Sequence, residues 1–254
     1  MLPRAASVTA RIGLVLTVVG ALALLLSGVG TRWDWWDFRT GFLVLRWTLY
    51  GGLAVIVVAL AGLVLGLLAR TGRSLLISLV TLALLAAVAV VPVGYLRNAG
   101  RVPPIHDITT DLDDPPRFVA VLPRRQGAPN PAEHGGAALA AQQRVGYPDL
   151  GPARFTAPPD RVFARAVDIA RDLGWEIVAT APAEGRLEAT DRTRWFGFRD
   201  DVVVRVRPDG AGSRVDVRSV SRVGRSDLGT NARRIRGFMA ALRTALPGET
   251  VTPR

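Results

Sequence analysis

The chain contains no cysteine and no lysine. Without cysteine it can form no disulfide, no thiolate nucleophile and no cysteine-ligated zinc site. The absence of cysteine is compatible with a location on either side of a membrane. All 32 basic residues are arginine. We interpret this as codon bias, because a chemical demand for guanidinium would not remove lysine from every surface position. Arginine still binds carboxylate and phosphate in a bidentate way that lysine cannot, so an anionic ligand remains a candidate.

Nucleic acid is not an expected partner, although the formal net charge is +11. The basic residues are spread along the chain, and no basic run is interleaved with the stacking aromatics of a nucleic-acid reader. No cofactor motif is present either: the sequence has no P-loop, nucleophile elbow or GxGxxG, and RVGRSDLG at 222–229 fits none of them.

Three long apolar runs make up most of residues 1–97, at about 12–30, 47–69 and 74–96. Each is long enough to cross a hydrocarbon core of about 30 Å as a helix. The first run could be a cleaved signal peptide, but no convincing A-x-A site follows it, so we expect an uncleaved anchor. Proton relays and transport paths need ionisable groups inside the membrane, and their scarcity here indicates a tether rather than a transporter.

The numbers of arginines that flank the runs on the two sides of the membrane are close to balanced, so the count alone does not set the orientation. One side of the membrane carries Arg4, Arg11, Arg70 and Arg73, and the other carries Arg32, Arg39, Arg46, Arg97 and Arg101. The purely basic turn at 70–73 favours the cytoplasm under the positive-inside rule. We therefore predict a bacterial inner-membrane protein whose C-terminal domain is periplasmic.

The polar part of the chain predicts an α+β domain. We expect a polar neck at 98–117, a domain at 118–247 and a tail at 248–254. Within the domain, FVAVLP at 118–123 reads as a strand and 124–152, rich in Gly, Pro and Ala, as an irregular wrap. Helical spacing and period-two alternation predict the remaining elements: helices after Pro158–Pro159 and at about 230–246, and strands at 175–180, 185–191, 201–207 and 214–221. This order predicts an antiparallel sheet of four to five strands with two helices on one face, which is helix-grip-like.

Four stretches together carry a family resemblance: PPIHDITTDLDDPPRF (103–118), YPDL (147–150), WFGFRDDVVVRV (195–206) and RSVSRVGRSDLGTNARRIRGF (218–238). With them the chain resembles the bacterial and plastid family known as domain of unknown function 1499, over about residues 101–246. The resemblance implies a membrane-tethered domain and carries no mechanism.

The stretch HDITTDLDD offers a weak metal or catalytic hypothesis. Imidazole and carboxylate ligands suit several divalent ions, and the candidate ligands are His106, Asp107, Asp111 and Asp113. The run lacks the glycine and distal glutamate of a calcium loop, so we expect no metal site. We instead expect the aspartates of the neck to pair with arginines of the domain.

SRVGRSDLGTN at 221–231 is the stronger candidate site, because glycines and arginines precede a helix whose first N–H groups lack partners. The alternative is a helix cap with an Arg–Asp pair. The predicted anion-binding residues are Arg218, Arg222, Arg225, Ser226 and Asn231. Nearby, Trp195, Phe196 and Phe198 can close the sheet, line an apolar pocket or enter the membrane surface.

We therefore expect a non-catalytic, membrane-anchored envelope domain without a cofactor. Its candidate partners are the lipid bilayer and an anionic small molecule, a lipid or an envelope protein. The alternative is a hydrolase, with His106 beside aspartates such as Asp107, or Ser226 with Asp227, as catalytic groups.

Overall fold

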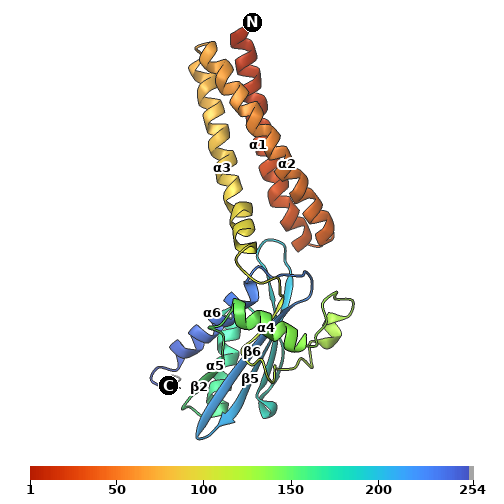
Figure 1. The fold of residues 1–254 in the computed structure, drawn as a ribbon, viewed down its shortest axis with the longest axis vertical. Helices are drawn as coiled ribbons and strands as arrows, with labels where there is room; N and C mark the ends of the chain where they lie inside the picture. Colours follow the sequence, from red (N-terminus) through yellow and green to blue (C-terminus); the bar gives the residue numbers. More distant parts are fainter. Residues whose placement is uncertain (252–254) are drawn as a thin grey trace. The chain divides into compact units, whose positions relative to one another are not determined.

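The structure is a computed structural model that describes residues 1–251. The chain divides into two compact units (Figure 1). The helical unit comprises Met1–Arg97 together with Arg194–Gly197, and the α+β unit comprises Asn98–Thr193 together with the chain from Phe198 onward. The boundary therefore falls where the third apolar run ends.

Three long helices form the helical unit: α1 (Leu2–Arg32), α2 (Phe38–Leu68) and α3 (Gly72–Ala99). Each is long and apolar enough to cross a membrane, as the sequence predicts. The helices extend beyond the predicted spans because the flanking polar residues continue the helical hydrogen bonding. The length and composition of these three helices indicate a membrane protein.

Small residues bring α1 and α2 close together. Ala6, Ala10 and Gly13 of α1 are buried, and so are Ala59 and Gly62 of α2. A Cβ built at Gly13 would lie 3.7 Å from the Ala59 Cα, and one at Gly62 would lie 3.2 Å from the Ala10 backbone nitrogen. Such small-residue interfaces are typical of membrane helices, where close backbone approach replaces hydrophobic burial as the source of association.

The α+β unit is built on a seven-stranded sheet with the order β3-β4-β5-β6-β2-β7, and β1 pairs with β6. All strand pairs are antiparallel. The strands are β1 (Asp107–Thr109), β2 (Ala153–Phe155), β3 (Glu176–Ala181), β4 (Arg186–Arg192), β5 (Arg199–Asp209), β6 (Gly212–Ser221) and β7 (Thr250–Val251). The four predicted strands correspond to β3–β6, and the three additional ones are too short to give a periodic pattern. β1 and β2 share one edge of β6, where β2 pairs with 213–215 and β1 with 218–220.

Two helices, α5 (Pro159–Asp172) and α6 (Thr230–Ala245), pack on one face of the sheet. We call it the helix face. Val202, Val204 and Val206 of β5 point into this core, and Trp175 stacks on Phe238 with ring centroids 5.2 Å apart. The α+β fold with an antiparallel sheet and two helices on one face is therefore confirmed, although the sheet has seven strands instead of the predicted four to five. Gly174, at φ +77°, follows the last turn of α5 in the left-handed conformation that commonly ends a helix.

The opposite face of the sheet, which we call the cover face, lies beneath residues 110–133. A small apolar cluster joins Phe118 and Val121 of this covering segment to Val203 and Val220 of the sheet. The prediction of a strand at 118–123 is wrong, because the amides of 119–121 bind a carboxylate instead of a neighbouring strand and Leu122–Arg125 form the 3-10 helix η1.

Two other segments also differ from their sequence-based description. Residues 124–152, expected as an irregular wrap, contain the helix α4 (Gly136–Gly146), whose alanine-rich composition favours it. The expected neck, 98–117, contains β1 and belongs to the α+β unit. In the expected tail, 248–254, residues 250–251 form β7, and residues 252–254 lie outside the described part of the chain.

We predict that a fragment of residues 98–254 unfolds cooperatively without the helical unit, because the core between sheet and helices is complete within it. In that fragment, Phe238→Ala should lower the free energy of unfolding by about 3–5 kcal/mol through the cavity it leaves. Val145→Ala, at a side chain that is 86% exposed, is the matched control and should change it by less than about 0.5 kcal/mol. Urea denaturation followed by circular dichroism measures both, and a gradual, non-cooperative loss of signal would contradict the prediction.

Candidate functional site

The cover face is organised around buried carboxylates, beginning with Glu188 in β4. Its side chain is fully buried and accepts three backbone N–H groups of the covering segment, from Val119, Ala120 and Val121, at 2.9–3.0 Å. The guanidinium of Arg186 also contacts it. Hydrogen bonds to an ionised acceptor are about twice as strong as neutral ones, so Glu188 holds the covering segment on the sheet.

Asp201 in β5 is a second centre, and its side chain has no exposed surface. Arg222 donates to it from Nε and Nη2, at 2.9 and 2.8 Å. Arg125 of η1 donates from Nη1 at 2.5 Å, and the Thr190 hydroxyl donates at 2.6 Å. Two guanidinium groups from separate loops are therefore held by one carboxylate.

Asp107 and Arg218 form a third buried centre, paired in a bidentate manner at 2.9 and 2.8 Å. Arg218 also donates to the Pro116 and Ala132 carbonyl oxygens and lies over the Phe118 ring. All its nitrogens therefore bind the protein itself.

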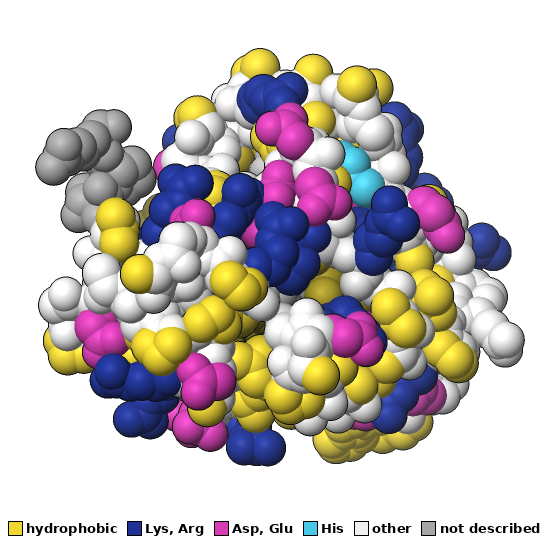
Figure 2. Space-filling model, turned by 90° about the horizontal axis from the view of Figure 1, so that it is seen from below, with side chains coloured by type: hydrophobic (Ala, Val, Ile, Leu, Met, Phe, Trp, Pro, Cys, Tyr) yellow, Lys and Arg dark blue, Asp and Glu magenta, His cyan; other side chains and the backbone are white. Residues whose placement is uncertain are grey.

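The outer end of the cover face holds a cluster of arginines and aspartates that Figure 2 shows as basic and acidic side chains gathered together. Asp111 accepts from Arg205, Arg207 and Arg214, and Asp216, with no exposed side-chain surface, binds the same three arginines. Burial opposes ionisation of Asp111, but the Asp114 N–H, Arg214 and the other donors outweigh it and lower its pKa.

The predicted pairing of neck aspartates with domain arginines is thus confirmed. Asp107 binds Arg218, while Asp111 and Asp114 bind arginines of β5 and β6. Asp113 makes a longer, exposed contact with Arg144 at 3.3 Å.

The predicted anion cradle at 221–231 is filled by the protein's own carboxylate. Asp227 accepts from the Gly229 N–H at 2.9 Å and from the Asn231 N–H at 2.6 Å, at the start of α6. Burial raises the pKa of Asp227, and these N–H groups act against that rise. Leu228 (φ +52°) and Gly229 (φ +78°) adopt the left-handed conformation that lets the loop fold back on this carboxylate.

The five predicted anion-binding residues therefore have different surroundings. Arg218 and Arg222 are committed to Asp107 and Asp201, and Ser226 accepts the Leu228 N–H through its hydroxyl. Asn231 is fully buried and binds the His106 carbonyl and the Ser219 and Ser221 hydroxyls. Arg225 alone among them is exposed.

On the helix face, Arg234 of α6 links two aspartates of neighbouring strands. It donates to Asp191 at 2.8 Å and to Asp200 at 2.7 Å. Burial raises the pKa of Asp200, and the positive charge of Arg234 opposes that rise. The hydroxyl of Tyr147 is also buried without a hydrogen-bond partner among the described residues, and burial together with Asp227 raises its pKa to about 12.

The stretches 103–116 and 222–231 meet at the backbone carbonyl groups of residues 105 and 106. The Ile105 carbonyl accepts the Asp227 N–H at 3.1 Å, and the His106 carbonyl accepts the side-chain amide of Asn231 at 2.9 Å. Within residues 1–251, no three His, Asp or Glu side chains are placed to hold a metal ion. The candidates His106, Asp107, Asp111 and Asp113 are thus not gathered, and Asp107 and Asp227 serve structural contacts.

The aromatic stretch between β4 and β5 lies at the unit boundary. Trp195 and Phe196 belong to the helical unit, where the Trp195 indole N–H donates to the Leu25 carbonyl at 3.2 Å. Phe196 packs on Phe42 with ring centroids 5.1 Å apart. A Cβ at Gly28 would overlap the Trp195 ring. Phe198 starts the return into the α+β unit, so the three rings do not line one pocket of that unit.

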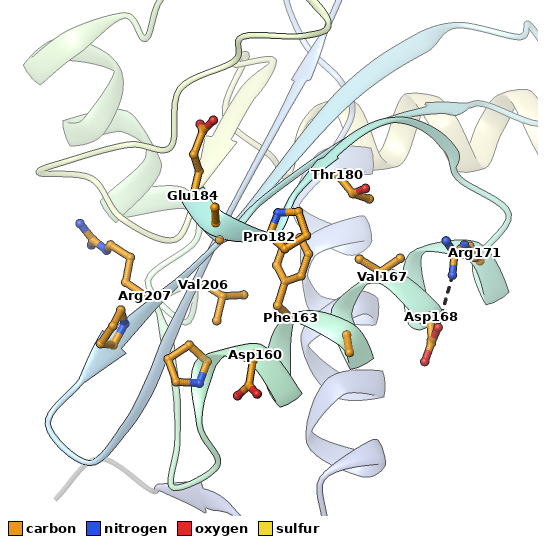
Figure 3. A pocket seen from close by; sticks show the side chains of 15 residues that line it. Asp160, Phe163, Val167, Asp168, Arg171, Thr180, Pro182, Glu184, Val206 and Arg207 are labelled. Atoms are coloured by element: carbon orange, nitrogen blue, oxygen red, sulfur yellow. Dashed lines mark hydrogen bonds and ion pairs between the residues drawn. The ribbon is translucent and has the colours of Figure 1, made fainter.

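An apolar groove runs along α5 in the α+β unit. We call it the α5 groove; its volume is about 810 Å³. Phe163 and Val167 of α5 face Pro182 of the 3-10 helix η2 (Pro182–Glu184) and Val206 of β5 (Figure 3). Asp168 and Arg171 contact each other at 3.5 Å at one end, and Glu184 and Arg207 lie at the other.

Sequence reasoning missed the α5 groove. Its apolar residues follow the same helical and strand periodicity as the core, so pattern alone assigns them to the core. One signal was available in the sequence: PAEG at 182–185 separates two predicted strands. In the structure, Gly185 has φ +59°, and a Cβ at this position would overlap the Val206 carbonyl oxygen. That close approach positions η2 beside α5.

We predict that Asp201→Ala destabilises the α+β unit strongly, by about 3–5 kcal/mol, because it leaves the buried guanidinium of Arg125 and the partly buried one of Arg222 without their carboxylate. Asp168→Ala is the matched control. It removes an exposed carboxylate whose contacts with Arg165 and Arg171 are 3.8 and 3.5 Å long, and it should cost about 0–1 kcal/mol. Urea unfolding of residues 98–254 compares the two, and equal losses would show that Asp201 does not anchor the cover.

Comparisons with known proteins identify the α+β unit. The family model described as "Protein of unknown function (DUF1499)" matches residues 107–242, from β1 into α6. No curated protein matches the chain. Among solved structures, the chain is similar to the crystal structure of CalU16 from Micromonospora echinospora, with 16% sequence identity and a TM-score of 0.28. That similarity covers 36% of this chain and 72% of CalU16. Because the family model covers more than half of the chain, the protein belongs to the DUF1499 family.

Proposed function

We propose that the protein is a membrane-tethered, non-catalytic binding domain of the bacterial envelope, with a lipidic ligand held in the α5 groove. The observation that carries this proposal is the groove itself. Ligand sites are concave, mostly apolar and about 300–1,000 Å³ in volume, and the α5 groove is about 810 Å³ with Phe163, Val167 and Val206 in its wall.

The charges at the ends of the groove suit an amphipathic ligand. Arg171 lies at one end and has only a long, exposed contact with Asp168, at 3.5 Å. An exposed pair of this kind contributes little, so a carboxylate or phosphate headgroup can replace Asp168 as the partner of Arg171. The acyl chain would then lie along Phe163 and Pro182.

The buried arginine network supports a structural role for most of the polar motifs. Arg125, Arg218 and Arg222 each bind a buried carboxylate. An added anion would have to displace that carboxylate and leave it buried without a partner, which is strongly unfavourable. We therefore place the ligand at the groove and not at the loop 221–231.

We predict that a diazirine-bearing palmitic acid cross-links the full chain, in detergent micelles, at peptides of α5 and η2. Ala164→Trp places an indole into the groove that Ala164 lines. It should reduce cross-linking at these peptides at least about tenfold, which corresponds to about 1.4 kcal/mol. Mass spectrometry of the proteolysed protein measures the yield peptide by peptide, so that labelling of α1–α3 is counted separately.

Ala240→Trp is the matched control, because Ala240 is exposed on α6 and does not line the groove. It should leave labelling of α5 and η2 unchanged. Labelling confined to the membrane helices in the wild type, or equal labelling in both variants, would contradict the groove as the binding site.

We further propose that the N-terminus lies in the cytoplasm and the α+β unit in the periplasm of a bacterial inner membrane. The support is the basic turn between α2 and α3, where Arg70 and Arg73 lie on the opposite side of the membrane from the end of α3. Arginine in short loops favours the cytoplasmic side.

Alkaline phosphatase fused after residue 254 should therefore be active, since it folds only outside the reducing cytoplasm. The paired measurement uses a fluorescent reporter that matures only in the cytoplasm, fused at the same position. An inactive phosphatase together with a bright reporter would reverse the orientation while leaving the groove proposal intact.

A further inference from the structure

The sheet ends in a row of arginines on the cover face. Arg192 of β4 is the cross-strand partner of Arg199 in β5. The Arg222 N–H, just past β6, donates to the Arg199 carbonyl at 3.0 Å, which places Arg222 next in the row. Alternate residues of a strand share one face, so Arg192 and Arg199 project to the same side as Glu188 and Asp201.

Arg222 is paired with Asp201, but the charges of Arg192 and Arg199 are not neutralised. Both side chains are exposed, and neither guanidinium forms an ion pair within residues 1–251. The Asp191 carboxylate accepts only the backbone N–H of Arg192 and is paired with Arg234. Like charges directly opposite each other on adjacent strands are destabilising. The pair contrasts with Arg205 and Arg207 at the outer end of the sheet, which share Asp111 and Asp216.

A third exposed arginine lies next to the row. Arg225 is exposed in the loop that leaves the same end of the sheet after Arg222. The neighbouring Asp227 does not neutralise it, because that carboxylate is held by the Gly229 and Asn231 N–H groups. The exposed arginines at this end therefore attract an external anion.

Chain connectivity limits how far these arginines can lie from the membrane helices. The chain passes from one unit to the other at 97–98, 193–194 and 197–198. Arg192 and Arg199 are two residues from the last two of these crossings. The Arg225 loop is held at the first one, where Asn98, in the last turn of α3, donates from Nδ2 to the Leu228 carbonyl at 2.5 Å. α3 is a candidate membrane span.

We propose that Arg192 and Arg199, together with Arg225, bind the headgroup phosphates of anionic phospholipids where the third membrane span ends. A guanidinium group matches two phosphate oxygens in a bidentate geometry, and anionic lipid between Arg192 and Arg199 relieves their repulsion. This contact would orient the α+β unit on its own membrane. It is independent of the α5 groove and holds on either side of the membrane.

The test titrates the full chain in neutral detergent micelles with short-chain phosphatidylglycerol or phosphatidylcholine and counts bound lipid by native mass spectrometry. The wild type should prefer phosphatidylglycerol. In Arg192→Gln/Arg199→Gln the apparent affinity for phosphatidylglycerol should fall roughly 25-fold, since each arginine near an anionic surface contributes about fivefold. The affinity for phosphatidylcholine should not change.

Two control variants separate charge at this row from charge in general. Arg165→Gln/Arg243→Gln removes two exposed arginines from α5 and α6, on the helix face, and should keep the preference. Arg192→Lys/Arg199→Lys keeps both positive charges and should retain part of the preference for phosphatidylglycerol. The melting temperature of each variant shows whether a loss of binding comes from a folding defect.

Three results would overturn the proposal: no preference for phosphatidylglycerol in the wild type, the same preference in Arg192→Gln/Arg199→Gln, or an equal loss in the helix-face control. Inorganic phosphate is titrated in parallel. If inorganic phosphate binds with the same apparent affinity as phosphatidylglycerol and displaces it, the row is a site for a free anion and the lipid assignment is wrong.

Discussion

The α+β unit depends on the carboxylate of Asp201. It lies in the central strand β5 with no exposed surface, and it holds Arg125 of the covering segment and Arg222 of the loop before α6. Neither segment has a regular hydrogen-bond ladder of its own. A buried charge requires several well-placed donors, so this one carboxylate determines where both segments lie. Glu188 in β4, which pairs with Val203 two residues from Asp201, plays the same part for residues 119–121.

The two faces of the sheet consequently follow different physical rules. On the helix face, apolar side chains such as Val204 and Phe238 pack against α5 and α6, and the contribution of each scales with the area it buries. On the cover face, ion pairs and backbone-to-carboxylate hydrogen bonds hold an irregular segment, and each depends on exact donor geometry. An irregular chain needs this kind of support, because its backbone groups must find individual partners.

This division also separates structural from functional polarity. HDITTDLDD and SRVGRSDLGTN are the motifs that first suggest chemistry, but most of their polar side chains make structural contacts within the α+β unit. Asp107 binds Arg218, and Asp227 caps α6. The features that remain open to an outside molecule lie elsewhere. They are the apolar α5 groove and the exposed arginine pair at the end of β4 and β5. Both are consistent with the lipidic ligand and the lipid headgroup contact that we propose.

The sequence by itself determined the three membrane helices, α5, α6 and the four long strands, because each repeats apolar residues at its own period over enough residues to be recognised. It also predicted that the neck aspartates would find arginines. Only the tertiary structure decided which arginines pair with those aspartates. It also decided that the amides of residues 119–121 bind Glu188 instead of forming a strand, and that a groove opens beside η2. These outcomes depend on contacts between residues up to 111 positions apart, such as Asp107 and Arg218, and local periodicity carries no information about such pairs.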